Sequence, residues 1–214
     1  MRSGPELREL SAGQFTDELD ALAEIYALAM AAPVAELPGR ISIMERHARH
    51  HGAEGRVAVQ PGEQGRHRDA GENAAGDRRP LVGFAYGFHG LAGQWWHDVV
   101  ADNLAARRGR QAAGHWLGDS FEFAEVHVHP DHQARGTGRA MMHALAAGRP
   151  ERTAVLSTPH GQTRARRLYR SLGFVDLLPA FSFPGAGPAY AIMGAVLPLR
   201  EAPPDARSAS PSRW

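Results

Sequence analysis

The feature that most constrains this chain is a glycine-rich turn between an apolar strand and a helix. The apolar segment ends at Pro130, and the run Gln133-Ala134-Arg135-Gly136-Thr137-Gly138 then opens a helical pattern. Glycines at this spacing let the backbone approach a ligand closely and adopt unusual dihedral angles. The amides of a helix N-terminus form an anion site, to which Arg135 and Arg139 add positive charge. The turn predicts a phosphate or pyrophosphate site, although it matches neither the dinucleotide motif nor the P-loop.

Strands and helices alternate on either side of this turn. The apolar spacing predicts strands at 121–129 and 153–158 and helices at 137–147 and 163–172. The remaining predicted elements are helices at about 16–30 (with Thr16 as N-cap), 38–50 and 99–108, and strands at 7–10, 56–59, 81–88, 174–177 and 190–197. This order predicts an α/β or α+β fold with a mixed sheet and helices on its faces.

The chain is predicted to divide into one domain and a tail. Residues 1–200 form the domain, with a flexible loop at about 60–80 and a long insertion at about 90–119. Residues 201–214 are rich in Pro, Ser and Arg, and this composition predicts disorder.

Composition excludes several classes of function. All 24 basic residues are arginines, and the chain has no cysteine, which excludes disulfides, thiolate zinc sites and an acyl-cysteine intermediate. The formal net charge of +1 provides no general attraction to nucleic acid or anionic membranes. Apolar stretches are too short for a membrane span, and the N-terminus lacks the apolar core of a signal peptide. We therefore expect a cytoplasmic protein without nucleic-acid or membrane partners.

A second motif lies downstream of the turn, in the run Ala165-Arg166-Arg167-Leu168-Tyr169-Arg170-Ser171-Leu172-Gly173-Phe174. Together, the glycine-rich turn and this helix resemble the signature of the GNAT superfamily of N-acetyltransferases, with a strand between them as that family has. The resemblance covers roughly residues 5–198. It implies a central, mostly antiparallel sheet with a splayed strand pair, flanked by helices on both faces. It also implies acetyl-CoA as co-substrate.

The resemblance assigns cofactor-binding roles to particular residues. In that family the glycine-rich loop holds the pyrophosphate of acetyl-CoA, and the backbone of the preceding strand pairs with the pantetheine arm. The matching loop residues are Gln133, Arg135, Gly136, Thr137, Gly138 and Arg139, and the matching strand residues are Val126 and Val128. Tyr169 matches a tyrosine near the thiol of CoA. Gln162 stands where the family often has an asparagine that contacts the cofactor.

The chemistry of acyl transfer suggests catalytic candidates. Moving an acyl group from a thioester to an amine requires a base for the amine proton, donors for the oxyanion and an acid for the thiolate. Glu125 is the favoured base, because it lies three residues before Val128 on the strand beside the thioester site, and Tyr169 is the favoured acid. Simple alternation places Glu122 on the opposite face from Glu125, unless a bulge changes the parity. Glu122 and His127 stay open as alternative bases.

No motif identifies the acceptor. Trp95, Trp96 and Tyr86 are candidates to line its pocket, and we expect a small-molecule amine, with a peptide or protein N-terminus as the alternative. A non-catalytic CoA-binding sensor and an unrelated nucleotide-phosphate binder are the competing functions. Homodimers are common among proteins of this type.

Histidines close to the glycine-rich turn have a spacing that resembles a metal site. His127, His129 and His132 form this pattern, but neither a cysteine nor a firm carboxylate partner completes a ligand set. The sequence therefore predicts no metal.

Overall fold

The computed structural model describes residues 6–60, 79–185 and 187–201. The chain forms two compact units, Met1–His89 with Glu122–Ala147 and Gly90–Phe121 with Gly148–Trp214, which we call the first and second unit. Residues 61–78 of the expected loop and residues 202–214 of the expected tail lie outside the described residues. The prediction of one domain over residues 1–200 stays a prediction.

The first unit contains most of a run of neighbouring strands. These strands are β1 (Glu6–Leu10), β2 (Glu54–Val59), β3 (Leu81–Gly90) and β4 (Ser120–Val128), adjacent in that order. β1 pairs antiparallel with β2, so that Leu10 lies opposite Gly55, and β2 pairs antiparallel with β3, with Val57 opposite Phe84. The end of β4 is tied to β3, because the His129 amide donates to the carbonyl of Val82 over 2.9 Å.

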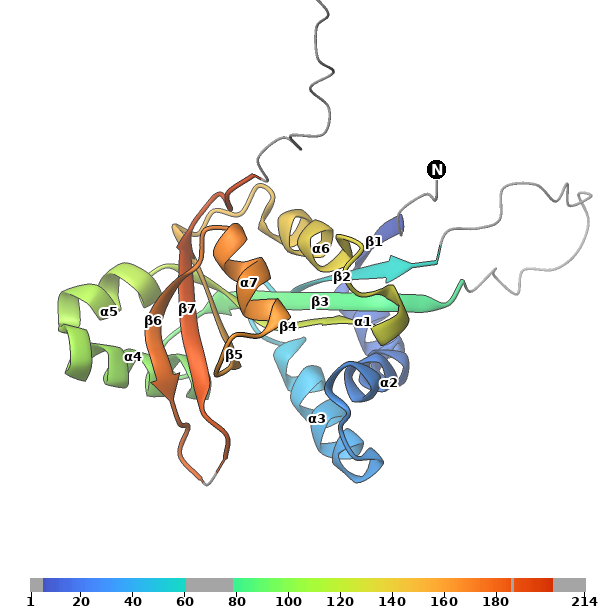
Figure 1. The fold of residues 1–214 in the computed structure, drawn as a ribbon, viewed down its shortest axis with the longest axis horizontal. Helices are drawn as coiled ribbons and strands as arrows, with labels where there is room; N and C mark the ends of the chain where they lie inside the picture. Colours follow the sequence, from blue (N-terminus) through green and yellow to red (C-terminus); the bar gives the residue numbers. More distant parts are fainter. Residues whose placement is uncertain (1–5, 61–78, 186, 202–214) are drawn as a thin grey trace, which may run out of the picture. The chain divides into compact units, whose positions relative to one another are not determined.

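Helices cover both faces of the strands in this unit (Figure 1). α1 (Ala12–Asp17), α2 (Leu19–Met30) and α3 (Leu37–His47), with a 3-10 turn at Val34–Glu36, lie on one face, and α6 (Thr137–Ala146) lies on the other. Phe84 and Tyr86 on β3 join the core that Leu22 and Met44 form beneath α2 and α3. Gly83 faces the opposite way, and a Cβ added there would lie 3.3 Å from Met141 of α6. Because successive side chains of β3 point to opposite faces of the sheet, the strand packs against helices on both faces.

The first helix begins earlier than its predicted start. Thr16 is not an N-cap, because Ser11 caps α1 instead. The Ser11 hydroxyl accepts the Gln14 amide, and the Gln14 side chain accepts the amide of Ser11, which makes a capping box. Phe15 is buried in the core, so burial adds to the cap in starting the helix here.

The second unit has three antiparallel strands and three α-helices among its described residues. The strands lie in the order β5 (Thr153–Pro159), β7 (Tyr190–Val196) and β6 (Val175–Phe181). The helices are α4 (Trp95–Arg108), α5 (Arg110–Leu117) and α7 (Arg164–Ser171). Their core includes Val100, Leu104, Leu117, Val155 and Ile192.

The insertion is more helical than the sequence pattern predicts. α4 begins at Trp95 rather than near 99, and α5 is an additional helix. Gly109 separates the two helices with φ +88°, a conformation that glycine adopts without steric cost. β6 also continues to Phe181, four residues past its predicted end.

The predicted fold class is confirmed. The described residues form a mixed α/β structure with mostly antiparallel strands and flanking helices. Among the helices described, none combines the length and apolar character that a membrane crossing requires.

Candidate active site

The turn after β4 leaves a helix N-terminus open. A 3-10 turn at Pro130–His132 follows the strand, and Ala134 and Gly136 then take positive φ values of +59° and +85°. Gly136 is the N-cap of α6, so no side chain caps the first amides of that helix. Uncapped amides and the positive end of the helix dipole favour an anion at this point.

The other predicted loop residues surround this N-terminus in different ways. Arg135 is exposed and Arg139 is partly buried, while Thr137 is buried and its hydroxyl has no hydrogen-bond partner among the described residues. The Gln133 side chain is engaged within the turn, because its amide donates to the carbonyl of Val128 over 3.1 Å. These residues could hold a pyrophosphate through backbone amides and Arg135, with Gln133 bracing the turn.

Glu125 sits in a network of charged and polar side chains on β4. Its Oε1 accepts from Nη1 of Arg40 on α3 over 2.7 Å, and its Oε2 is hydrogen-bonded to Nε2 of His127. Nη2 of Arg40 donates to the hydroxyl of Tyr26 on α2 over 2.8 Å. The side chains of Glu125 and His127 are only 10% and 11% exposed, so water screens these contacts weakly. We call Tyr26, Arg40, Glu125 and His127 the β4 cluster.

Arg40 keeps its charge in this partly buried position. Burial lowers the pKa of its guanidinium, but the negative charge of Glu125 and the interactions with Tyr26 outweigh that effect and raise the pKa above the usual value. The guanidinium carbon also lies 4.3 Å from the centroid of the Tyr26 ring, a cation–π distance. The β4 cluster is therefore built around a permanent cation.

The regular alternation of side chains between the two faces of β4 is interrupted before Glu125. Ala124 packs against the core beneath α2 and α3, and the next residue, Glu125, reaches Arg40 on α3. Two successive residues of β4 therefore face the same layer of helices, which happens where a β-bulge interrupts the alternation of side chains. The change brings Glu125 and His127 onto the face with Tyr26, whose ring lies 5.1 Å from that of His127.

Glu122, the alternative base, lies outside the β4 cluster. Its side chain is buried, and its Oε2 has no hydrogen-bond partner among the described residues. Burial raises the pKa of Glu122 to about 8, so that this carboxyl group is protonated at neutral pH. A protonated, enclosed carboxyl group is poorly suited to accept a proton from a ligand.

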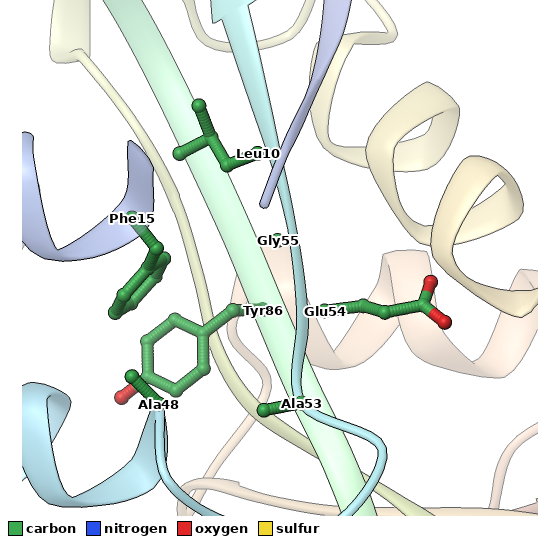
Figure 2. A pocket seen from close by; sticks show the side chains of 7 residues that line it. All are labelled: Leu10, Phe15, Ala48, Ala53, Glu54, Gly55 and Tyr86. Carbon is green, nitrogen blue, oxygen red and sulfur yellow. The ribbon is translucent and has the colours of Figure 1, made fainter. Parts of the chain in front are cut away.

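Tyr86, a predicted pocket residue, is part of the core. It is 2% exposed, its hydroxyl is 3.1 Å from Nδ1 of His47, and burial raises its pKa well above the usual value. It also lines a small apolar pocket, whose other members are Leu10, Phe15, Ala48, Ala53, Glu54 and Gly55. Figure 2 shows the rings of Phe15 and Tyr86 close together there, with the Glu54 carboxylate directed away from them.

The remaining candidates lie in the second unit. Trp95, at the start of α4, is 61% exposed, and its ring lies tilted against that of Phe183 with the ring centroids 5.4 Å apart. Trp96 packs against the core of this unit. Tyr169 on α7 is 7% exposed. Gln162 precedes that helix, and its Oε1 accepts from Nη1 of Arg170 over 3.1 Å.

The structure also reveals residues that the motifs did not identify. Arg40 and Tyr26 belong to no motif, and the ion pair of Arg40 with Glu125 joins residues 85 positions apart. One signal was available: Arg40 lies beside Leu37, Ile41 and Met44 on the apolar stripe of its helix. A charged residue in such a stripe needs a buried partner. As for the histidine pattern, the described part of the chain contains no group of three His, Cys, Asp or Glu residues that could hold a metal ion.

Comparison with known proteins gives one family model and one curated relative. The model, described as an acetyltransferase (GNAT) domain, matches residues 92–176. The relative is a GCN5-like protein acetyltransferase of Mycobacterium tuberculosis, 44% identical over 125 residues. The aligned part covers 56% of this chain and 60% of the relative, so the chain spans about 60% of that protein's length.

Solved structures with the same fold extend over most of the chain. A GNAT-family acetyltransferase, labelled putative, from Desulfovibrio desulfuricans has a TM-score of 0.56 at 14% identity, covering 89% of this chain and 98% of that one. The protein yncA of Salmonella typhimurium, labelled a putative acetyltransferase and solved with acetyl-CoA, has a TM-score of 0.52 at 18% identity, covering 95% of this chain and 99% of that one. At these identities the likeness shows the fold alone.

Proposed function

We propose that the chain is a GNAT acetyltransferase that transfers the acetyl group of acetyl-CoA to an amine, since part of it matches the acetyltransferase (GNAT) domain model and the curated relative. The observation that carries the proposal is the uncapped N-terminus of α6, which follows a loop with two left-handed residues and lies next in sequence to the strand that holds Glu125. The loop suits the pyrophosphate of CoA, and the strand supplies a group that can take a proton.

The proposed reaction is direct transfer in a ternary complex. The neutral amine attacks the thioester carbonyl, and a base on β4 removes its proton, with Glu125 as the group around which that base is built. Tyr169 is proposed as the acid for the departing thiolate, on the strength of the motif around it. Val126 and Val128 are proposed to pair with the pantetheine arm, and Gln162 to contact the cofactor. With no cysteine, the chain offers no thiol for an acyl-cysteine intermediate.

The acceptor is proposed to be a small-molecule amine, with Trp95 and Trp96 of the second unit as candidate lining residues; Tyr86, buried in the core of the first unit, is no longer a candidate. A protein amine is the second candidate, because the curated relative is a protein acetyltransferase by name. A library of small amines and of peptides, with detection of released thiol, tests both. Thiol release only with peptides would replace the first candidate by the second.

Two results would contradict acetyl transfer itself. If calorimetry detects CoA binding but no amine or peptide releases thiol, the chain is a CoA-binding sensor. If ATP or NAD binds and CoA does not, the turn serves a different nucleotide.

Gly136→Ala tests the anion site. A Cβ at this position meets no atom within 4 Å, so the cost comes from a φ of +85° alone, about 1–2 kcal/mol of stability. Because the change distorts the loop, we expect CoA to bind roughly tenfold more weakly, about 1.4 kcal/mol, in calorimetry. Gly148→Ala is the matched control, with φ +69°, equally open space and a position after the end of α6. Equal CoA affinities in both variants would contradict the assignment.

A further inference from the structure

The hydrogen bonds of the β4 cluster determine which atom can take a proton. Both oxygens of Glu125 are engaged, Oε1 by Arg40 and Oε2 by His127. A carboxylate is an acceptor only, so Nε2 of His127 must carry the hydrogen of this bond. In the neutral imidazole, Nδ1 then has a free lone pair, and it makes no hydrogen bond to any residue that the structure describes.

We propose that His127, through Nδ1, accepts the proton of the attacking amine, and that Glu125 and Arg40 are positioning residues that hold its imidazole. The inference rests on the proposed acetyl transfer and assigns its base. Tyr26 meets the His127 ring edge-on at 5.1 Å and 85°, and the Phe84 ring lies 5.4 Å away. The ring is therefore held by packing on two sides and by the carboxylate at Nε2.

The groups around His127 are neutral apart from the ion pair of Arg40 and Glu125. The titratable groups that face the cluster are Tyr26 of α2, Arg40 and His47 of α3, Tyr86 of β3, and Glu122 and Glu125 of β4. Burial, aided by His50, lowers the pKa of His47 to about 4, and burial raises the pKa of Glu122 to about 8. Both are therefore neutral near pH 7, as is Tyr86. The guanidinium of Arg40 and the carboxylate of Glu125 balance one another, and Glu125 lies directly against the imidazole that becomes positive.

The step balances in atoms and charge. The amine nitrogen forms a bond to the thioester carbonyl carbon, and the carbon–sulfur bond then breaks and releases the CoA thiolate. The proton lost from nitrogen goes to Nδ1 of His127. The thiolate takes a proton from the acid, proposed as Tyr169, so the products are a neutral amide and CoA thiol. The enzyme is left with an imidazolium at His127 and a tyrosinate at Tyr169, and one proton passed from the first to the second through water restores both. No further reactant is needed.

His127→Gln is the central test. We expect kcat to fall about 100-fold or more, with the KM for acetyl-CoA within about threefold, because the imidazole acts on the amine and not on the cofactor. The acidic limb of the pH profile of kcat/KM should disappear, since that limb reports the base of the free enzyme. His50→Gln is the control, because this ring packs on Phe88 and His47 and has no hydrogen bond to the β4 cluster among the described residues, so kcat should stay unchanged.

Variants of Arg40 distinguish a role in positioning the His127 ring from a role in packing alone. Arg40→Gln removes the cation and should lower kcat about tenfold, while Arg40→Lys keeps a charge and should recover most of that loss. Nitrogen NMR of the His127 ring in the free wild-type protein supplies a readout that needs neither turnover nor a variant. We expect hydrogen on Nε2 and none on Nδ1 in the neutral form of the ring, recorded at a pH above which its nitrogen shifts no longer change.

Each outcome decides one question. Hydrogen on Nδ1 of His127 in the wild type would overturn the inference. So would an active wild type whose His127→Gln variant keeps the same kcat and pH profile. Neither result would contradict acetyl transfer itself. A wild type that releases no thiol with any amine or peptide would overturn the proposed function, and the inference with it, even if the ring carries its hydrogen on Nε2.

Discussion

Glu125→Gln is expected to lower kcat by about 10²- to 10⁴-fold. The amide that replaces the carboxylate can donate as well as accept, so it no longer fixes the hydrogen on Nε2 of His127. It also removes the negative charge that balances Arg40 and stabilises the imidazolium. Loss of the corresponding aspartate in serine proteases costs about 10⁴-fold for the same reason, a wrong tautomer. Steady-state kinetics with the best amine from the library, from pH 6 to 9, measure the effect.

The matched control is Glu24→Gln, which removes an exposed carboxylate from α2. It should leave kcat and the pH profile unchanged. Nitrogen NMR of the Glu125→Gln variant should also show the ring hydrogen of neutral His127 exchanging between Nδ1 and Nε2. An active wild type with the same kcat in Glu125→Gln would show that the carboxylate has no part in catalysis.

Glu122→Gln is expected to change how stability depends on pH. Burial raises the pKa of Glu122 from 4.5 to about 8, so the folded chain holds this proton more tightly than the unfolded chain. Its contribution is therefore fully present below about pH 4.5 and is lost as the pH rises towards 8, by about 1.4 kcal/mol of unfolding free energy per pH unit. The amide does not titrate. From pH 5 to pH 8, wild type should lose about 3.5 kcal/mol relative to Glu122→Gln, since the slope flattens near the folded pKa.

Urea unfolding at a series of pH values from 5 to 8 measures the difference. The comparison between variants is needed because His47 acts in the opposite direction: its pKa is lowered to about 4, so its contribution to stability is lost as the pH falls from 6.5. That contribution is common to both proteins and cancels. Glu24→Gln again serves as the control, and parallel curves for wild type and Glu122→Gln would contradict the burial argument.

Local patterns predicted the elements whose signals lie within a few residues. α7 follows Thr163, whose hydroxyl accepts the Arg166 amide, and it ends just before Gly173 with φ +99°. The turn at Gly136 likewise has the open helix N-terminus that its glycine spacing predicted. Each depends on hydrogen bonds and dihedral angles of neighbouring residues, which a sequence displays directly.

Other elements depended on burial and were predicted less well. α5 has Gly114 in its interior, and it is held by Ala113 and Leu117 in the core of the second unit. The start of α1 combines a capping box between Ser11 and Gln14 with the burial of Phe15. Helix propensity is a weak guide where packing against other elements supplies most of the stability.

The sequence by itself determined the fold class, the family resemblance and the glycine-rich turn with its open helix N-terminus, because these rest on spacings of a few residues. It also proposed Glu125, but left Glu122 and His127 open as bases. Only the tertiary structure shows how their surroundings differ: Glu125 and His127 lie against α2 and α3, where Arg40 and Tyr26 meet them, and Glu122 is buried and protonated. These surroundings support the proposal of His127 as the base. The physical reason is that a carboxyl group's role depends on its neighbours and its burial, and here the decisive neighbour lies 85 residues away.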